Sequence, residues 1–275
     1  MSTTLALSLL AACCLACGAV MTKEFVDRLP GPQLIGPLFL FNAVIAWPLA
    51  PFVDWQWSTR IVLLHLASIG ALLVVAWVMF SLYAHGTASA TTTAQGLSPI
   101  PAALLASVFL SIPLEPVQAV AAAVVVAAVL IALPGAFATL ERRGATLRIC
   151  IAACGFASIT VLSRLLADQG ASTIEIYVVR TTAAGLIYTI AIPPRNVPRS
   201  VAPKLFLRAS FITAHFLLVI EAVRRGSPTV VQTALATTPL IAMGVEAVRH
   251  GRRPSLRVAL CALAVLAAVA LLALE

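Results

Sequence analysis

Ten long apolar segments follow one another along this chain of 275 residues. A helix needs about 20 mostly apolar residues to cross the hydrocarbon core of a bilayer. These runs are apolar on all sides, so their length rather than their periodicity marks them as membrane spans. The predicted spans are residues 3–22, 34–53, 61–83, 87–111, 117–134, 147–167, 173–192, 205–223, 228–248 and 256–274. The sequence therefore predicts an all-α membrane protein with ten transmembrane helices.

The composition excludes a soluble domain. Apolar residues make up 61% of the chain and charged residues only 10%, against about 25% charged residues in soluble domains. The net charge of +8 lies in the gaps between apolar runs, which is typical of loops facing anionic lipid. No basic run is interleaved with aromatic residues, so a nucleic-acid partner is not expected. Arginine outnumbers lysine and alanine is abundant, which favours a bacterial inner membrane as the location.

The six cysteines all lie inside apolar runs, where cysteine packs as a small hydrophobe. Two pairs, Cys13/Cys17 and Cys150/Cys154, have i,i+4 spacing. No histidine or carboxylate accompanies either pair at ligand spacing, so neither a metal nor a cofactor is expected.

The first apolar run contains Leu10-Ala11-Ala12-Cys13, which looks like a lipoprotein cleavage box. An export signal has a basic segment before its apolar core, and residues 1–4 carry no positive side chain. The run also continues past the box to Met21. We therefore expect it to be a retained first span.

Weak echoes between the two halves predict an internal repeat. The pattern Cys13-x-x-x-Cys17-Gly18 recurs as Cys150-x-x-x-Cys154-Gly155, and Pro99 recurs as Pro239 at nearly the same offset. We predict a first repeat over 1–134, a connecting loop over 135–146 and a second repeat over 147–275. Because each repeat has five spans, an odd number, the second must enter the membrane from the opposite side. Such inverted repeats suit alternating access around a site near the membrane midplane.

The chain resembles the EamA family of the drug/metabolite transporter superfamily along essentially its whole length. The motifs that carry the likeness are Gly226-Ser227-Pro228, Thr238-Pro239-Leu240, Gly251-Arg252-Arg253-Pro254-Ser255 and, in the first half, His85-Gly86, Pro99, Pro101 and Leu114-Glu115-Pro116. The resemblance implies a secondary transporter, commonly an exporter of amino acids, metabolites or drugs. It also implies a central cavity lined by helices 1, 3, 4, 6, 8 and 9, with helices 5 and 10 peripheral.

The distribution of basic residues and the resemblance to the EamA family predict opposite orientations in the membrane. The gaps after odd-numbered spans hold thirteen basic residues and the opposite side holds four, a bias that places both termini outside the cytoplasm. Members of the EamA family usually place both termini in the cytoplasm. The sequence leaves the two orientations open.

Arg180 is the deepest charge, eight residues into the seventh span, and a buried charge needs a reason. It is a candidate to bind an anionic group of the substrate or to pair with Glu221. The alternatives are a structural ion pair and a snorkelling side chain. The resemblance matches Arg180 to an arginine often found in the family, and its counterpart region in the second span carries Asn42. Trp77, deeper than the other tryptophans, is a further candidate for the pathway.

Polar seams on the fourth and ninth spans supply the remaining substrate-binding candidates, which are Gln95, Gln232 and Thr237. Helix-to-helix packing through small polar residues explains these seams equally well. Pro99 and Pro239 interrupt backbone hydrogen bonding near the middle of the same two spans, so both helices should bend there.

Protons are a candidate coupling ion, with Glu221 and His215 as the candidate sites. Glu221 lies three residues before Arg224, and Glu246 lies three residues before Arg249. A local ion pair with that arginine is therefore the favoured role of each carboxylate. A neutral hydrogen-bonded histidine is an equal alternative for His215. His65 is expected at the membrane interface.

The predicted function is a secondary transporter, and an exporter is the expected direction. It would move a small metabolite, amino acid or drug-like molecule by alternating access, with membrane lipid around it. A lipid flippase or an accessory membrane subunit is a second reading of the same fold. An intramembrane lipid-processing enzyme is a third, but the HExxH, GxSxG and Gly-rich Lys motifs are absent from the sequence. The oligomeric state is left open.

Overall fold

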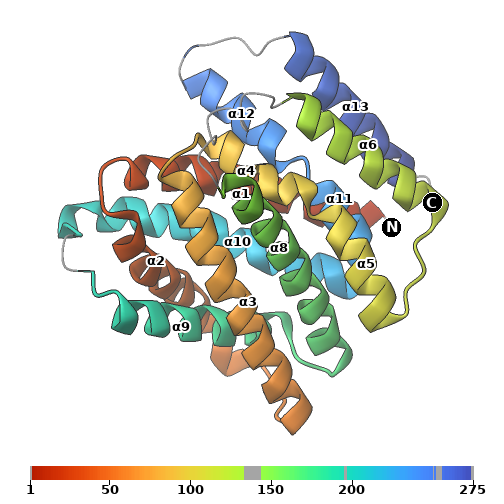
Figure 1. Ribbon diagram of the computed structural model, residues 1–275. Helices are drawn as coiled ribbons and strands as arrows, with labels where there is room; N and C mark the ends of the chain where they lie inside the picture. The colour runs from red at the N-terminus through yellow and green to blue at the C-terminus, as the bar shows by residue number, and fades with distance from the viewer. Residues whose placement is uncertain (1, 133–143, 195–196, 250, 252–255, 274–275) are drawn as a thin grey trace.

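The computed structural model describes the chain except for residues 1, 133–143, 195–196, 250, 252–255 and 274–275, and its described part is helical (Figure 1). The helices of the first half are α1 Ser2–Val26, α2 Gly31–Ala46, η1 Trp47–Phe52, α3 Thr59–Tyr83, α4 Ala88–Leu97, α5 Pro99–Leu110 and α6 Pro116–Ala132. Those of the second half are α8 Ala145–Asp168, α9 Thr173–Ala191, η2 Arg199–Val201, α10 Ala202–Arg225, α11 Pro228–Leu235, α12 Thr238–Arg249 and α13 Leu256–Ala273.

The prediction of ten apolar helices is confirmed. Within the described residues, eight helical segments are long and apolar enough to cross a bilayer, and α6 and α13 are two shorter apolar helices. The fourth and ninth spans are each built from two helices, α4 with α5 and α11 with α12. The predicted connecting loop falls mostly outside the described residues, and α8 begins at Ala145, two residues before the predicted start.

Both middle spans break at the predicted prolines. Pro99 is the first residue of α5, and Pro239 is the second residue of α12. Proline lacks the N–H that would continue the preceding turn, so it is well placed only at the start of a helix. The breaks therefore follow from the sequence, and they lie at the same point of the two repeats.

Helix contacts follow an exchange of the two halves. The most extensive contacts are α1 with α10, α3 with α8, α2 with α9 and α6 with α13. Numbered as the ten spans in chain order, these contacts pair span 1 with 8, span 3 with 6, span 2 with 7 and span 5 with 10. Exchanging the two halves turns the pair of spans 1 and 8 into the pair of spans 6 and 3, and it leaves the other two pairs unchanged. The repeat glycines obey the same rule, because Gly18 packs on Ile212 of α10 and Gly155 packs on Val75 of α3. The structure thus has the symmetry of two repeated halves.

The two ends of the bundle differ in charge. The end where α1 and α3 finish and where α8 and α10 begin is called the basic face here; it carries Lys23, Arg28, Arg148, Lys204 and Arg249. The other end is called the opposite face, and α1 begins there, with Thr4 packed on Gly226. Helices α6 and α13 lie side by side at one edge of the molecule, as the resemblance implied for helices 5 and 10 (Figure 1).

Helices α2 and α9 approach each other through glycine. A Cβ atom on Gly36 would lie 2.4 Å from Thr189 Oγ1 and 2.8 Å from the Thr189 backbone nitrogen. We expect Gly36→Ala to lower the midpoint temperature of thermal unfolding and the folded yield, because the backbone of α9 must move to admit the methyl group. Size-exclusion chromatography and a thermal melt check this. Gly70→Ala is the matched control, since a Cβ atom there meets nothing within 4 Å. Equal stability of the two variants would contradict the predicted contact.

Candidate functional site: a buried pathway between the two halves

A small cavity lies between helices of both halves. It is lined from the first half by α1, α2 and α3, and from the second half by α8 and α10. Its volume of about 70 Å³ holds about two water molecules. The lining is mainly apolar and aromatic: Leu15, Leu38, Phe39, Leu72, Val75, Ala76, Met79, Phe80, Phe156, Ile212 and Phe216, with the polar residues Thr22, Asn42, Tyr83 and Arg208.

Not all the helices for which the resemblance implied a place at a central cavity line this small one. Helix 2 lines it through Leu38, Phe39 and Asn42, whereas the residues of helices 4 and 9 are not part of its lining. Hydroxyl groups of α4 and α11 bond to their own backbones. Thr91 Oγ1 donates to Thr87 O, and Thr233 Oγ1 donates to Thr229 O.

Asn42 is the polar group at the inner end of this cavity. Its side chain is completely buried, and neither its Oδ1 nor its Nδ2 has a hydrogen-bond partner among the described residues. It lies eleven residues along α2 from the basic face, which is a depth of about 16 Å. An unpaired buried amide costs free energy, so its retention at a cavity wall is typical of a group that binds a ligand.

Arg208 is the charged group on the basic side of the cavity. It lies in α10 and is buried, and its Nε donates to Thr22 Oγ1 of α1 at 2.9 Å. Arg208 is one of the thirteen basic residues assigned above to the gaps after odd-numbered spans, because it lies close to the predicted start of its span. The structure places it inside the bundle instead. A guanidinium and the Asn42 amide therefore line the same cavity.

Arg180 lies beyond the inner end of the cavity, toward the opposite face. It is 1% exposed, and its Nη2 donates to Ser163 Oγ of α8 at 2.8 Å. Its Nε and Nη1 have no hydrogen-bond partner among the described residues. Ser163 lies seven residues, or about two helical turns, past the cavity residue Phe156. Arg180 is therefore neither a snorkelling side chain nor part of an ion pair within the described chain.

The structure does not pair Arg180 with Glu221. The Glu221 carboxylate accepts hydrogen bonds from Thr173 Oγ1 at 3.0 Å and from Arg225 Nε at 2.7 Å. Its local partner is thus four residues away and not three, because Arg224 turns to Ala171 O and Thr173 instead. His215 is buried, and its Nδ1 lies 2.9 Å from Ala11 O of α1. The coupling roles of Glu221 and His215 stay predictions.

A second pair of buried polar residues lies toward the opposite face. His65 of α3 is 3% exposed and is thus enclosed by other helices, and its expected depth at the membrane interface stays a prediction. Its Nε2 lies 3.7 Å from Oε1 of Glu175, which is fully buried at the start of α9. The sequence analysis missed Glu175, although Ser172 and Glu175 form the S-x-x-E capping box that a sequence can show.

The breaks of α4 and α11 meet at a buried polar network. Gln95 Nε2 donates to Gln232 Oε1 at 2.5 Å, and Ser98 Oγ donates to the same oxygen at 2.6 Å. Gln232 Nε2 donates in turn to Phe156 O and Thr160 Oγ1 of α8. The two glutamines are separated along the chain by the same offset as the two cysteine motifs of the repeat. This network joins the halves at their equivalent points.

The remaining substrate-binding candidates lie elsewhere. Trp77 is half exposed and does not line the cavity. Gln95 and Gln232 are occupied by each other, and Thr237 Oγ1 donates to Ala234 O at 2.8 Å. Of the candidate substrate-binding residues, the structure brings Asn42 to the cavity wall and Arg180 to the path beyond it.

Charged residues close the basic face over the ends of α1, α4 and α12. Lys23 binds Asp27 at 2.6 Å and donates to Tyr83 O at 2.9 Å, and Arg249 pairs with Glu24. Arg249 thus has Glu24 as a partner from another helix, and its expected local pair with Glu246 stays a prediction. Glu246 Oε1 accepts the backbone N–H of Ala88 at 2.9 Å, at the start of α4. A carboxylate is well placed there because a helix N-terminus carries partial positive charge.

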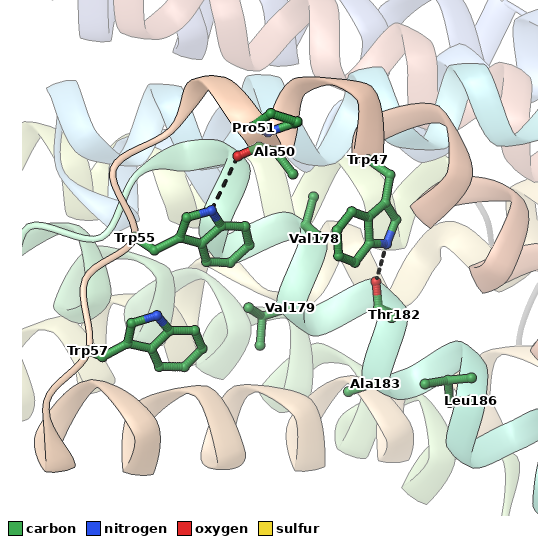
Figure 2. Close-up of a pocket in the computed structure, with 10 residues that line it drawn as sticks. All are labelled: Trp47, Ala50, Pro51, Trp55, Trp57, Val178, Val179, Thr182, Ala183 and Leu186. Carbon is green, nitrogen blue, oxygen red and sulfur yellow. Dashed lines mark hydrogen bonds between the residues drawn. The ribbon is translucent and has the colours of Figure 1, made fainter.

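A wider groove of about 610 Å³ lies on the side of the bundle between η1 and α9 (Figure 2). Its wall carries three tryptophans, of which Trp47 donates to Thr182 Oγ1 at 3.1 Å and Trp55 donates to Ala50 O at 3.2 Å. Trp55 and Trp57 stack with their ring centroids 6.1 Å apart. Tryptophans at the end of a span are typical of an interfacial belt, and that role is the prediction for these three at the end of the second span.

Repeated halves, broken middle helices and a cavity lined from both halves define a polytopic membrane transporter. The profile of the EamA-like transporter family matches residues 2–133 and again residues 144–274, so the chain belongs to that family, within the drug/metabolite transporter superfamily. The family consists of transporters and not of enzymes.

Comparison with solved structures agrees on the fold. One crystal structure superposes with a TM-score of 0.77 over 100% of this chain and 97% of the other, at 16% sequence identity. At that identity the likeness concerns the fold alone. No curated protein matched this sequence.

Proposed function

We propose that this protein is a secondary transporter that carries a small organic molecule between the basic face and the opposite face by alternating access. Family membership already places the chain in membrane transport. The proposal adds the route, which runs from the cavity past Asn42 to Arg180. The observation that carries it is the Asn42 amide, unpaired and fully buried in a cavity that both halves line. Export, the direction that the resemblance favours, stays a prediction.

The substrate that fits this route has an apolar or aromatic body and an anionic group. Phe39, Phe80, Phe156 and Phe216 supply aromatic surface around the cavity. Two buried arginines lie along the route, Arg208 on the basic side and Arg180 beyond the inner end. Guanidinium groups bind carboxylates strongly in dry surroundings, so amino acids and other carboxylic acids are the first solutes to test.

Uptake into proteoliposomes tests this function directly. The purified protein is reconstituted, and uptake of a panel of radiolabelled amino acids and aromatic carboxylic acids is measured with and without a pH gradient. We expect at least one solute to accumulate above the level in protein-free vesicles. No solute flux under any gradient, together with lipid translocation in the same vesicles, would contradict a solute carrier and favour a flippase.

The variant Asn42→Leu should reduce that uptake at least tenfold without lowering the thermal unfolding midpoint. Leucine has a similar volume, and it removes a buried amide that has no partner to lose. Gly70→Ala serves again as the control, because its site is open and Gly70 does not itself line the cavity. Wild-type uptake by Asn42→Leu would remove Asn42 from the pathway.

A further inference from the structure

Glu175 contacts the segment before α3 through one of its two carboxylate oxygens. Its Oε2 accepts the backbone N–H of Ser172 at 3.4 Å, which caps α9, and the backbone N–H of Gln56 at 3.3 Å. Gln56 belongs to the segment between η1 and α3. Its neighbours in the sequence are Trp55 and Trp57, whose rings stack on each other. A buried carboxylate thus ties this tryptophan segment, residues 53–58, to the start of α9.

The other carboxylate oxygen has no hydrogen bond. Oε1 of Glu175 is buried without a partner among the described residues, and both ring nitrogens of His65 are in the same condition. The 3.7 Å between Oε1 and His65 Nε2 is too long for a hydrogen bond. One proton placed between these two atoms would satisfy both, because a protonated carboxyl donates and a neutral imidazole nitrogen accepts.

Few other charges reach this pair. From α9 itself, Arg180 is close enough to interact electrostatically with the His65 ring. The nearest charged groups of α8 and α10 are engaged on the outer side, where Arg164 pairs with Asp168, and Glu221 pairs with Arg225. Arg224 is directed to Ala171 O and Thr173. Asp54 and Arg60, at the two ends of the tryptophan segment, are exposed.

We propose that Glu175 and His65 form a proton-binding site that controls the tryptophan segment on the opposite face. A proton taken up from the solvent binds Glu175 Oε1 and stays on it, and the resulting O–H donates a hydrogen bond to His65 Nε2, so the carboxylate loses its negative charge. Hydrogen bonds to a neutral carboxyl group are weaker than those to a carboxylate. The Gln56 N–H then loses its strong acceptor, and the tryptophan segment is released from α9. Deprotonation restores the tie.

This inference refines the proposed transport function by naming its proton site, but its test measures proton binding and needs no substrate. Purified protein carrying Trp47→Phe and Trp77→Phe reports on Trp55 and Trp57 alone. Its tryptophan emission is recorded in detergent while the pH is lowered, and far-UV circular dichroism confirms that the helices remain folded. We expect one titration step in the emission.

Glu175→Gln should abolish that step. Glutamine at this position still caps α9, so the variant is expected to fold. Asp168→Asn is the matched control, because Asp168 is an acidic residue at the same face that pairs with Arg164, and it should keep the step. An unchanged step in Glu175→Gln, or no step in the parent protein, would overturn the proposal.

If Glu175→Gln fails to fold, infrared difference spectra of the parent protein decide the matter. Acidification should produce the carbonyl stretching band of a protonated carboxyl group over the same pH range as the emission step, and its absence there would overturn the site. The two proposals fail separately. A titration step without solute flux contradicts the transport function, and flux without a step contradicts the proton site.

Discussion

Replacing Arg180 by glutamine should reduce transport of anionic solutes by at least about thirtyfold and leave the folded protein intact. Truncating one member of a buried, hydrogen-bonded charge pair costs about 2–5 kcal/mol, which corresponds to roughly thirtyfold or more in binding. Arg180 has two nitrogens free to make such a pair with a substrate, Nε and Nη1. Uptake of the most active solute of the panel is the measurement.

The thermal unfolding midpoint separates this role from a structural one. A buried charge without a counter-ion destabilises a folded protein, so removing it should leave the midpoint unchanged or raise it. Arg180→Lys is the matched variant, because it keeps the charge but loses the forked geometry that binds a carboxylate at two points. We expect it to retain part of the activity. A collapse of folded yield in Arg180→Gln would show that the arginine supports the fold instead.

Replacing Gln232 by leucine should destabilise the protein by about 2 kcal/mol or more. The change removes the acceptor of Gln95 and Ser98 and the donor to Thr160, and each of these lost hydrogen bonds is worth about 0.5–1.5 kcal/mol. Chemical unfolding in mixed micelles measures the change. We expect transport to fall as well, because the network joins the points at which α4 and α11 break.

Gln118→Leu is the control for that prediction. Gln118 lies in α6, and its Oε1 is buried without a hydrogen-bond partner among the described residues. The same change of chemistry therefore removes no hydrogen bond to this oxygen from a neighbouring group, and the free energy of unfolding should stay constant or rise. If both variants lose equal stability, the loss belongs to the amide-to-leucine exchange and not to the network between the halves.

The sequence predicted the architecture because its causes are local. Run length identifies a span wherever lipid surrounds it, and proline breaks a helix wherever it stands, as Pro99 and Pro239 show. The repeat could also be predicted, since the offset between its two cysteine motifs is the one that separates Gln95 from Gln232. The contact between those two side chains could not be predicted, because rows of small polar residues are compatible both with helix packing and with a cavity lining.

The site was harder to predict because burial depends on which faces of the helices meet. Arg208 lies near the end of its span, where sequence reasoning expects a surface charge, yet packing of α10 on α1 encloses it. Glu175 has a sequence signal in its capping box, but the box does not reveal that His65 lies close to it. Trp77 was singled out for its depth along α3, and depth does not show on which side of the helix a residue lies.

Accessibility of two positions on α3 tests alternating access most directly. In a cysteine-free background, Ala76→Cys labels the cavity and Ser68→Cys labels the path about two turns farther toward the opposite face. Each variant in sealed vesicles is treated with a membrane-impermeant maleimide from one side and then from the other. We expect Ala76→Cys to react faster from the side of the basic face, and Ser68→Cys to react faster from the side of the opposite face. Equal reaction rates from the two sides at both positions would indicate a channel, and no reaction of Ser68→Cys from any side would contradict a pathway through Arg180.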